Sequence, residues 1–338
     1  MKSVQLVAAG AALLLLAGCS ATAVEADASG EAGEPIKLTI AEPVHGVGYL
    51  PLYAAQEQGF FEDAGLEVEV TTLTGGGHVN ALLAGEVFGF IGGPESGAVA
   101  NVKGADLVAV ANVVNRGNVY FVAADGYEYE EGTDVAEFLR GKTIAGGRYG
   151  GTPNAILRHI LLENGLDPET DVELIEVEDS SAIPSIVAQG QAEIAVVAEP
   201  QLGMGIAEGI WGEPFLNPLQ LLGPYAYSSI VIQRSMLDED PETVQKFVDA
   251  LALGQDFIEN DPDAAFELAS VQFPTMDAAV LETVLARAYE DSLWGGTELS
   301  EEAVETALAV ARSGNILDDA EAPQDYSTIA DNQFINAD

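Results

Sequence analysis

The sequence predicts an α/β protein of two lobes, each built on a parallel sheet covered by helices. Segments typical of strands alternate with segments typical of helices as far as residue 232. Several of these strands are apolar on both faces, as 107–113 is, which is typical of parallel sheets buried between helix layers. Glycine-bearing loops follow the carboxyl ends of the strands, the edge at which open α/β sheets bind ligands.

We expect the chain to enter the second lobe near Ala124 and to leave it near 223–227. The expected domains are therefore lobe 1 over 36–123 and 226–338, and lobe 2 over 124–225. Two connections between the lobes would make a hinge of two strands with a cleft beside it.

The composition excludes some classes of partner. A length of 338 residues, 48% of them hydrophobic, is enough for two globular domains with cores of their own. The net charge of −43 excludes nucleic acid as a natural partner, because phosphates would be repelled. Acidic residues are spread along the whole chain, which indicates a salt-adapted protein whose self-repulsion is screened by counterions.

The N-terminus is typical of a secretion signal. Lys2 supplies a positive charge, residues 7–16 form an apolar run too short to span a bilayer, and Leu16-Ala17-Gly18-Cys19 follows. This ending resembles the bacterial lipobox, which implies removal of 1–18 and acylation of Cys19, with palmitate among the expected lipids. Residues 19–35 lack apolar periodicity and are expected to form a disordered tether. The single cysteine excludes disulfides within the chain and cysteine-based metal sites.

The elements of lobe 1 follow from periodicity and from glycines placed as helix ends. We expect strand 36–41, helix 51–58, a turn over 60–66, strand 67–73, helix 79–84, strand 88–91, a helix ending near 102, and strand 107–113. Gly59, Gly85 and Gly104 end the three helices, since glycine accepts the left-handed conformation common there.

Lobe 2 repeats the pattern. Its expected elements are strand 119–124, helix 135–139, strand 142–145, a helix from Pro153, strand 172–177, helix 182–189 and strand 194–197. Strand 230–232 then returns the chain to lobe 1, where helices 241–259, 261–271, 276–291 and 300–313 are expected to pack.

The stretch 141–168 is typical of a ligand-capturing loop. A strand leads into a glycine-rich loop and a helix, for which we expect Thr152 as N-cap, Pro153 at the first helical position and Asn164-Gly165 as the stop. Such a helix N-terminus directs free N–H groups at whatever lies beyond the strand. The lysine and serine or threonine of a P-loop are missing, which excludes a nucleotide loop of that kind.

Five runs resemble one known family. They are PLYAAQEQGFFEDAGLEV at 51–68, ALLAGEVFGFIG at 81–92, GKTIA at 141–145, NGLDPETDV at 164–172 and PSIVAQGQAEIA at 184–195. Their order is similar to that in the periplasmic binding proteins for alkanesulfonates, taurine, nitrate and thiamine-type pyrimidines. The resemblance covers about 36–257 and implies the two-lobed, type II fold of ABC-importer binding proteins, closing on a small molecule.

Candidate ligand-binding residues lie where strands end. In lobe 1 they are His45, Gly76, Gly77, His78, Glu95, Ser96 and Arg116; in lobe 2 they are Arg148, Tyr149, Thr152, Glu199 and Tyr225. The arginines would hold an anionic or carbonyl group, and the acids would accept from a nitrogenous end. Each also has a structural interpretation, as a tight turn, a solvated acid, a satisfied histidine or a core tyrosine.

The sequence therefore predicts an extracytoplasmic lipoprotein that delivers a solute to an ABC permease as a monomer, without cofactor, metal or catalytic residues. The expected ligand is a sulfonate, nitrate or thiamine-precursor-like pyrimidine. One alternative is the pyrimidine-forming enzyme of thiamine biosynthesis, which resembles these binders but relies on a cysteine-rich motif. The other is a ligand-sensing subunit of a signalling system.

Overall fold

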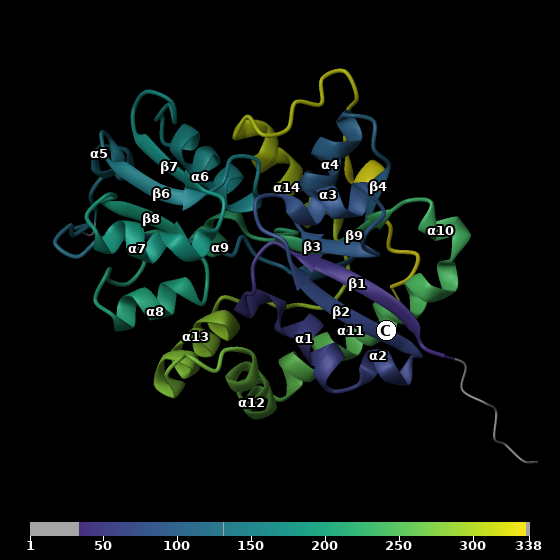
Figure 1. The fold of residues 1–338 in the computed structure, drawn as a ribbon. Helices are drawn as coiled ribbons and strands as arrows, with labels where there is room; N and C mark the ends of the chain where they lie inside the picture. The colour runs from purple at the N-terminus through teal and green to yellow at the C-terminus, as the bar shows by residue number, and fades with distance from the viewer. Residues whose placement is uncertain (1–33, 131, 336–338) are drawn as a thin grey trace, which may run out of the picture. The chain divides into compact units, whose positions relative to one another are not determined.

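The structure, a computed structural model, describes residues 34–130 and 132–335 (Figure 1). The expectations for the signal peptide, for Cys19 and for most of the tether lie outside these residues. The described part is α/β, with two sheets of five and four strands. The predicted fold class is confirmed.

The first sheet has the order β2-β1-β3-β9-β4. Its strands are β2 (Leu66–Thr72), β1 (Ile36–Glu42), β3 (Gly89–Gly92), β9 (Ser228–Gln233) and β4 (Leu107–Val114). Strand β1 pairs in parallel with β2 and β3, whereas β9 lies antiparallel between β3 and β4.

The second sheet has the order β5-β8-β6-β7. Its strands are β5 (Tyr120–Ala123), β8 (Ile194–Val197), β6 (Thr143–Gly147) and β7 (Glu173–Val177). Strand β6 is parallel to β7 and β8, and β5 is antiparallel to β8. The expectation of purely parallel sheets is therefore wrong at β5 and β9. Each is the first strand after the chain passes from one sheet to the other, so it enters where the parallel strands end.

Alternation along the strands of the first sheet divides its core into two layers. Ile40, Ile91 and Val108 belong to one apolar cluster with Phe247 of α11 (Pro241–Asn260). Their neighbours Ala41, Phe90 and Ala109 belong to the other cluster. That cluster also contains Leu82 of α3 (Gly77–Leu83), Ala98 of α4 (Pro94–Val102) and Leu308 of α14 (Glu301–Ser313). Helices therefore cover both faces of this sheet (Figure 1).

The helices of the first layer are α1 (Leu50–Glu57), α2 (Phe60–Asp63) and α11, followed along the chain by α12 (Pro262–Gln272) and α13 (Ala278–Glu290). Those of the second are α3 (Gly77–Leu83), α4 (Pro94–Val102) and α14 (Glu301–Ser313). The second sheet carries α5 (Val135–Leu139), α6 (Thr152–Glu163), α7 (Ile183–Ala188), α8 (Gln201–Ala207) and α9 (Pro218–Leu222). Short helices α10 (Met236–Glu239) and α15 (Tyr326–Ile329) complete the set.

Most helix boundaries follow the sequence signals. Gly59, Gly85 and Gly104 have φ of 78°, 71° and 95° at helix ends, as expected. The turn expected over 60–66 instead contains α2, because Phe61 is buried and its ring stacks 4.9 Å from that of Phe247. A helix of one turn gains its stability from such tertiary packing, so no sequence periodicity indicates it.

The C-terminal helices contact elements of both sheets. Helix α14 packs on α4 and on α6, and α13 packs on α8. Residues from Glu34 onward thus form one compact unit, and the lobe boundaries at 124 and 225 stay a prediction.

Candidate functional site

A cavity of about 100 Å³ lies where strands of both sheets end. Gly92 and Gly147 are the last residues of β3 and β6. Pro43 and Val44 follow β1, Gly93 follows β3, and Glu178 and Ser180 follow β7. The other lining residues are Tyr49, Gly75, His78, Ser96, Arg148, Gly151, Thr152, Pro153, Tyr227 and Ser228. The cavity occupies the carboxyl edge at which α/β sheets bind ligands.

Two helices begin at this cavity. Ser96 lies in the first turn of α4, and Thr152 is the first residue of α6. The free N–H groups and the positive dipole end of a helix favour an anion at this position. The cavity thus has the electrostatics of an anion site on two sides.

Arg148 supplies a positive charge to the cavity wall. Its guanidinium covers the glycine loop before α3, so closely that a Cβ at Gly76 would lie 3.2 Å from Arg148 Cζ. Nη1 donates to its neighbour's carbonyl at Tyr149, 3.1 Å away. Burial lowers the pKa of Arg148, an effect that the charge of Glu178 opposes. Among the described residues no carboxylate oxygen lies within 4 Å of it, so Arg148 is a cation without an ion-pair partner.

His78 is a neutral member of the cavity wall. Burial, and then the charge of Arg148, lower the pKa of His78 to about 4. Its Nδ1 lies 3.4 Å from the carbonyl oxygen of Leu73, and its ring meets Phe90 edge-on. At neutral pH the imidazole therefore contributes hydrogen bonding but no charge.

Glu95 is buried beside the cavity and joins α4 to α6. Its side chain is 1% exposed; Oε1 accepts a hydrogen bond from the hydroxyl of Thr152, and Oε2 has no partner among the described residues. The carboxyl folds back over Gly93, where an added Cβ would lie 2.2 Å from it. Burial raises the pKa of Glu95 to about 7. The expected N-cap role of Thr152 is wrong: Gly151 is the N-cap, and Thr152 bonds to Glu95 because it faces α4.

The structure brings His78, Ser96, Arg148 and Thr152 together at the cavity and places Glu95 next to it. Gly76 and Tyr149 line an adjoining groove instead. Gly77 begins α3 behind that loop, where an added Cβ would lie 3.2 Å from Leu73.

Four other candidates lie away from the cavity lining. Glu199 accepts from Arg287 Nη1 at 2.5 Å and from the Gly203 amide at 2.8 Å. His45 contacts Glu42 and the Gln272 carbonyl. Arg116 donates to the Asn115 carbonyl. Tyr225 is fully buried, and its hydroxyl has no hydrogen-bond partner among the described residues.

Sequence reasoning missed several lining residues. Glu178 and Ser180 follow β7 and could have been found by the strand-end rule applied to 172–177. That rule could not find Tyr227 and Ser228, because Tyr227 precedes the antiparallel strand β9 and Ser228 begins it at the same edge.

Two features are absent from the described residues. No group of three histidine, cysteine or carboxylate side chains there could hold a metal ion. In the ranges 34–130 and 132–335, no helix combines the length and apolar character needed to cross a membrane.

Comparison with known proteins identifies the fold and the family of this chain. YtlA of Bacillus subtilis (strain 168), named provisionally as a binding protein, is 28% identical over 257 residues, 74% of this chain and 75% of YtlA. The ligand-binding component of an ABC-type import system from Staphylococcus aureus, with zinc bound, is 15% identical, with a TM-score of 0.71 over 88% of this chain and 97% of that one. The alkanesulfonate-binding protein SsuA from Xanthomonas axonopodis pv. citri, bound to MOPS, is 19% identical, with a TM-score of 0.67 over 84% and 95% of the two chains.

The fold is shared with an enzyme as well. The desulfurization enzyme DszB is 17% identical, with a TM-score of 0.60 over 88% of this chain and 97% of DszB. These identities show a common fold. Residues 47–265 match the family model described as NMT1/THI5 like, which covers more than half of the 338 residues. The resemblance drawn from the sequence is thus confirmed, and the chain belongs to the NMT1/THI5-like family.

Proposed function

We propose that this protein is an extracytoplasmic solute-binding lipoprotein of an ABC importer and that its ligand carries an anionic group. The observation that carries the proposal is Arg148, which has no ion-pair partner within 34–130 and 132–335, in a cavity between strand ends of two sheets. The names of relatives support it, since SsuA binds an alkanesulfonate and the Staphylococcus aureus protein serves an ABC-type import system.

An anion fits the cavity better than a cation does. The chain has 55 acidic and 12 basic residues, yet no carboxylate oxygen of the described residues lies within 4 Å of the Arg148 guanidinium. Glu178 lies in the same wall but beyond that distance, and its charge acts on Arg148 without pairing with it. The hydroxyls of Ser96 and Ser180 can donate to ligand oxygens, whereas that of Ser228 donates to the Tyr49 hydroxyl. The N-termini of α4 and α6 add their dipoles. A volume of about 100 Å³ accommodates roughly three waters or a group of similar size, such as a sulfonate or nitrate.

The nitrogenous end expected from the sequence finds less support. The carboxylate of Glu199 is committed to Arg287. Glu95 does not line the cavity, and its Oε2 is buried without a partner among the described residues, so this carboxyl is not placed to accept from a nitrogenous group of a ligand. Both facts favour the sulfonate or nitrate class over an aminopyrimidine.

Ligand capture would work by closure. The Thr152 to Glu95 hydrogen bond joins α6 of the second sheet to α4 of the first, so it forms only when the two sheets approach. A ligand held by Arg148 on one side and by α4 on the other binds the closed form better than an open one. That differential affinity shifts the population towards closure.

A thermal-shift screen at high salt tests the ligand class with methanesulfonate, nitrate and an aminopyrimidine as probes. We expect stabilisation that grows with the logarithm of probe concentration for the anions. Arg148→Ala should reduce the affinity for the anion at least tenfold, while Arg140→Ala, which removes an exposed partner of Asp171, should leave it unchanged. Equal binding to the Arg148→Ala variant would refute the assignment.

Lipid anchoring and transport need separate tests. We expect Cys19→Ala to move the protein from the membrane fraction to the medium and to abolish palmitate labelling. Co-purification should recover a permease, and the chain should be monomeric in solution. Mass spectrometry should recover the bound probe unaltered, whereas chemical conversion of the probe would indicate an enzyme. Co-purification of a kinase-like partner in place of a permease would indicate a sensor.

A further inference from the structure

The end of helix α14 packs against α6 of the second sheet. His159 Nδ1 on α6 lies 2.6 Å from the hydroxyl oxygen of Ser313. Gly314 follows, so close to α6 that an added Cβ would lie 2.9 Å from the Ala155 carbonyl oxygen. Residues 313–315, which we call the clasp, thus connect the helix layer of the first sheet to α6 (Figure 1).

The side chain of Tyr149 extends this contact to the loop before α6. Its hydroxyl donates to the carbonyl oxygen of Asn315, the last residue of the clasp, at 2.6 Å. The Arg158 guanidinium lies over its ring, with Cζ 4.8 Å from the ring centroid. Arg158 is buried and is itself fixed by ion pairs of 2.6 Å to Glu169 and 2.9 Å to Glu176. Tyr149 is therefore held at both its ring and its hydroxyl, although its side chain is exposed.

The loop that carries Arg148 is flanked by glycines. Gly147 precedes Arg148, and Gly150, with φ of 82°, and Gly151 follow Tyr149. Glycines on both sides give a backbone more conformational freedom than other residues would. Arg148 makes its only hydrogen bond within the described residues to the Tyr149 carbonyl, at 3.1 Å. The position of the guanidinium thus depends on where Tyr149 is held.

We propose that Tyr149 is a positioning residue that bonds to the clasp and thereby sets Arg148 against the anion in the closed protein. This inference rests on the proposed function and gives a role to a residue outside the cavity lining. The Tyr149 hydroxyl joins the loop of the second sheet to the helix layer of the first, so its bond breaks when the two sheets separate. Arg148 is then fully positioned only in the closed form, which holds the ligand.

Tyr149→Phe tests this role, because it removes the hydroxyl and keeps the ring beside Arg158. We expect methanesulfonate to bind about two- to tenfold more weakly, the range that corresponds to the net contribution of one hydrogen bond. The loss should lie in faster dissociation, with the association rate changed by less than about twofold. Titration calorimetry and stopped-flow kinetics on the full chain at constant KCl measure the affinity and the two rates.

A double variant shows whether Tyr149 acts through Arg148. In the Arg148→Ala background, Tyr149→Phe should change the affinity for methanesulfonate by less than about twofold, because the group that it positions is gone. An equal loss in both backgrounds, or an unchanged affinity in the Tyr149→Phe variant, would overturn the positioning role and leave the anion site standing. Failure of the parent protein to bind methanesulfonate or nitrate would instead overturn the proposed function itself.

Tyr289→Phe is the matched control, because the Tyr289 hydroxyl also donates to a distant backbone carbonyl, that of Ile258 at 2.7 Å, and lies outside the cavity. It should leave the affinity and both rates unchanged.

Gly314→Ala tests the clasp from the other side. The added methyl would press on the Ala155 carbonyl oxygen and move the clasp away from α6, while the φ of −74° at Gly314 suits alanine. We expect this variant to weaken methanesulfonate binding by about twofold or more, again through faster dissociation, in line with loss of part of one hydrogen bond. Normal binding by Gly314→Ala would contradict the role of the clasp.

Discussion

At the residue scale, burial changes the pKa of the Glu95 carboxyl. Burial raises the pKa of this carboxyl from its ordinary value of 4.5 to about 7, although the Thr152 hydroxyl opposes the shift. The folded protein therefore holds a proton that the unfolded chain releases near pH 4.5. Stability from this source is complete below pH 4.5 and is lost as the pH rises to about 7, because the folded state binds more protons across that window.

Glu95→Gln should remove this pH dependence, since glutamine is neutral at every pH. The difference in free energy of unfolding between variant and parent should change by about 3 kcal/mol between pH 4.5 and 7, in favour of the variant at the higher pH. Urea unfolding at constant salt measures it, and taking the difference cancels the titration of His45 and His78. Parallel pH profiles of the two proteins would contradict the prediction.

At the scale of the element, the start of α3 depends on glycine for two reasons. Gly76 is the N-cap with φ of 79°, and Arg148 lies over it at a distance that leaves little room for a side chain. Glycine tolerates both the left-handed backbone and the close approach. The conformation of this short loop therefore affects both the start of α3 and the position of Arg148 at the cavity.

Gly76→Ala should cost about 1 kcal/mol of stability through backbone strain and should also displace Arg148, weakening methanesulfonate binding severalfold. Gly59→Ala is the control, because Gly59 has a matching φ of 78° before α2 but no atom within 4 Å of an added Cβ. It should lose similar stability and bind the probe normally. Denaturant unfolding measures the stability of both variants, and calorimetry measures their affinity for methanesulfonate. Equal affinity in the two variants would show that Gly76 is needed only for its backbone conformation.

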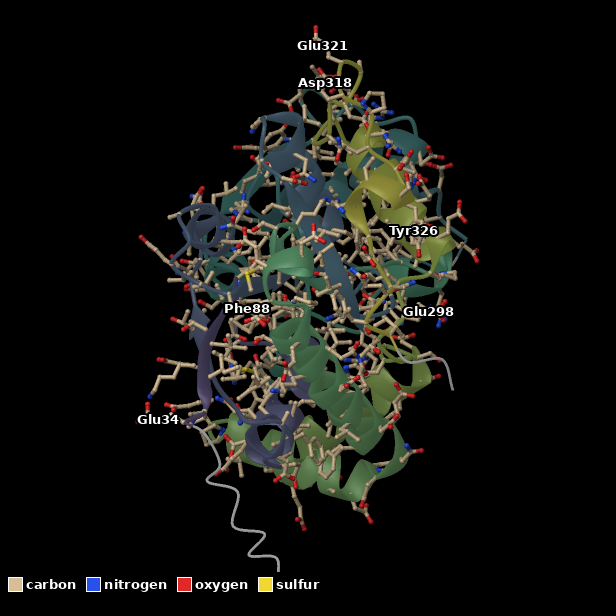
Figure 2. The ribbon with its side chains drawn as sticks, turned by 90° about the vertical axis from the view of Figure 1, so that its right-hand side faces the viewer. Glu34, Phe88, Glu298, Asp318, Glu321 and Tyr326 are labelled. Atoms are coloured by element: carbon tan, nitrogen blue, oxygen red, sulfur yellow. The ribbon has the colours of Figure 1, made fainter. Side chains whose placement is uncertain are left out.

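At the scale of the whole molecule, the main feature is the large negative net charge. Exposed carboxylates such as those of Glu298, Asp318 and Glu321 point away from the fold (Figure 2). The net charge of −43 makes the compact state repel itself at low salt. Salt screens such charges strongly, since the Debye length falls from about 10 Å at 0.1 M to about 3 Å at 1 M.

The melting temperature should therefore rise by about five degrees between low and molar KCl, as relief of a few kcal/mol of repulsion implies for a chain of this size. Calorimetric scans across a KCl series measure this. A parallel series in sucrose separates screening from general exclusion of cosolutes, which also favours the folded state. A melting temperature that does not change with KCl, or that rises equally in sucrose, would argue against salt adaptation.

Much of the fold was predictable because local signals agree with the final packing. Strand β8 and helix α5 have the expected bounds, and glycines end the helices as expected. The short helix α2 and the antiparallel strands β5 and β9 were not predictable in the same way. They depend on Phe61 meeting Phe247 and on where the chain crosses between sheets, both of which are contacts far apart in sequence.

The sequence by itself determined the α/β class, the family and the strand-end loops from which the site is built, because periodicity, glycine placement and motif order are local properties. Only the tertiary structure decided which candidates share a cavity. It separated Arg148, which has no carboxylate partner in the part of the chain that the structure describes, from Glu199, which is paired with Arg287. It also brought Thr152 to Glu95. Ion pairing depends on which side chains of distant segments meet in the fold. The spacing of residues along the chain does not determine the partner of a single arginine or glutamate.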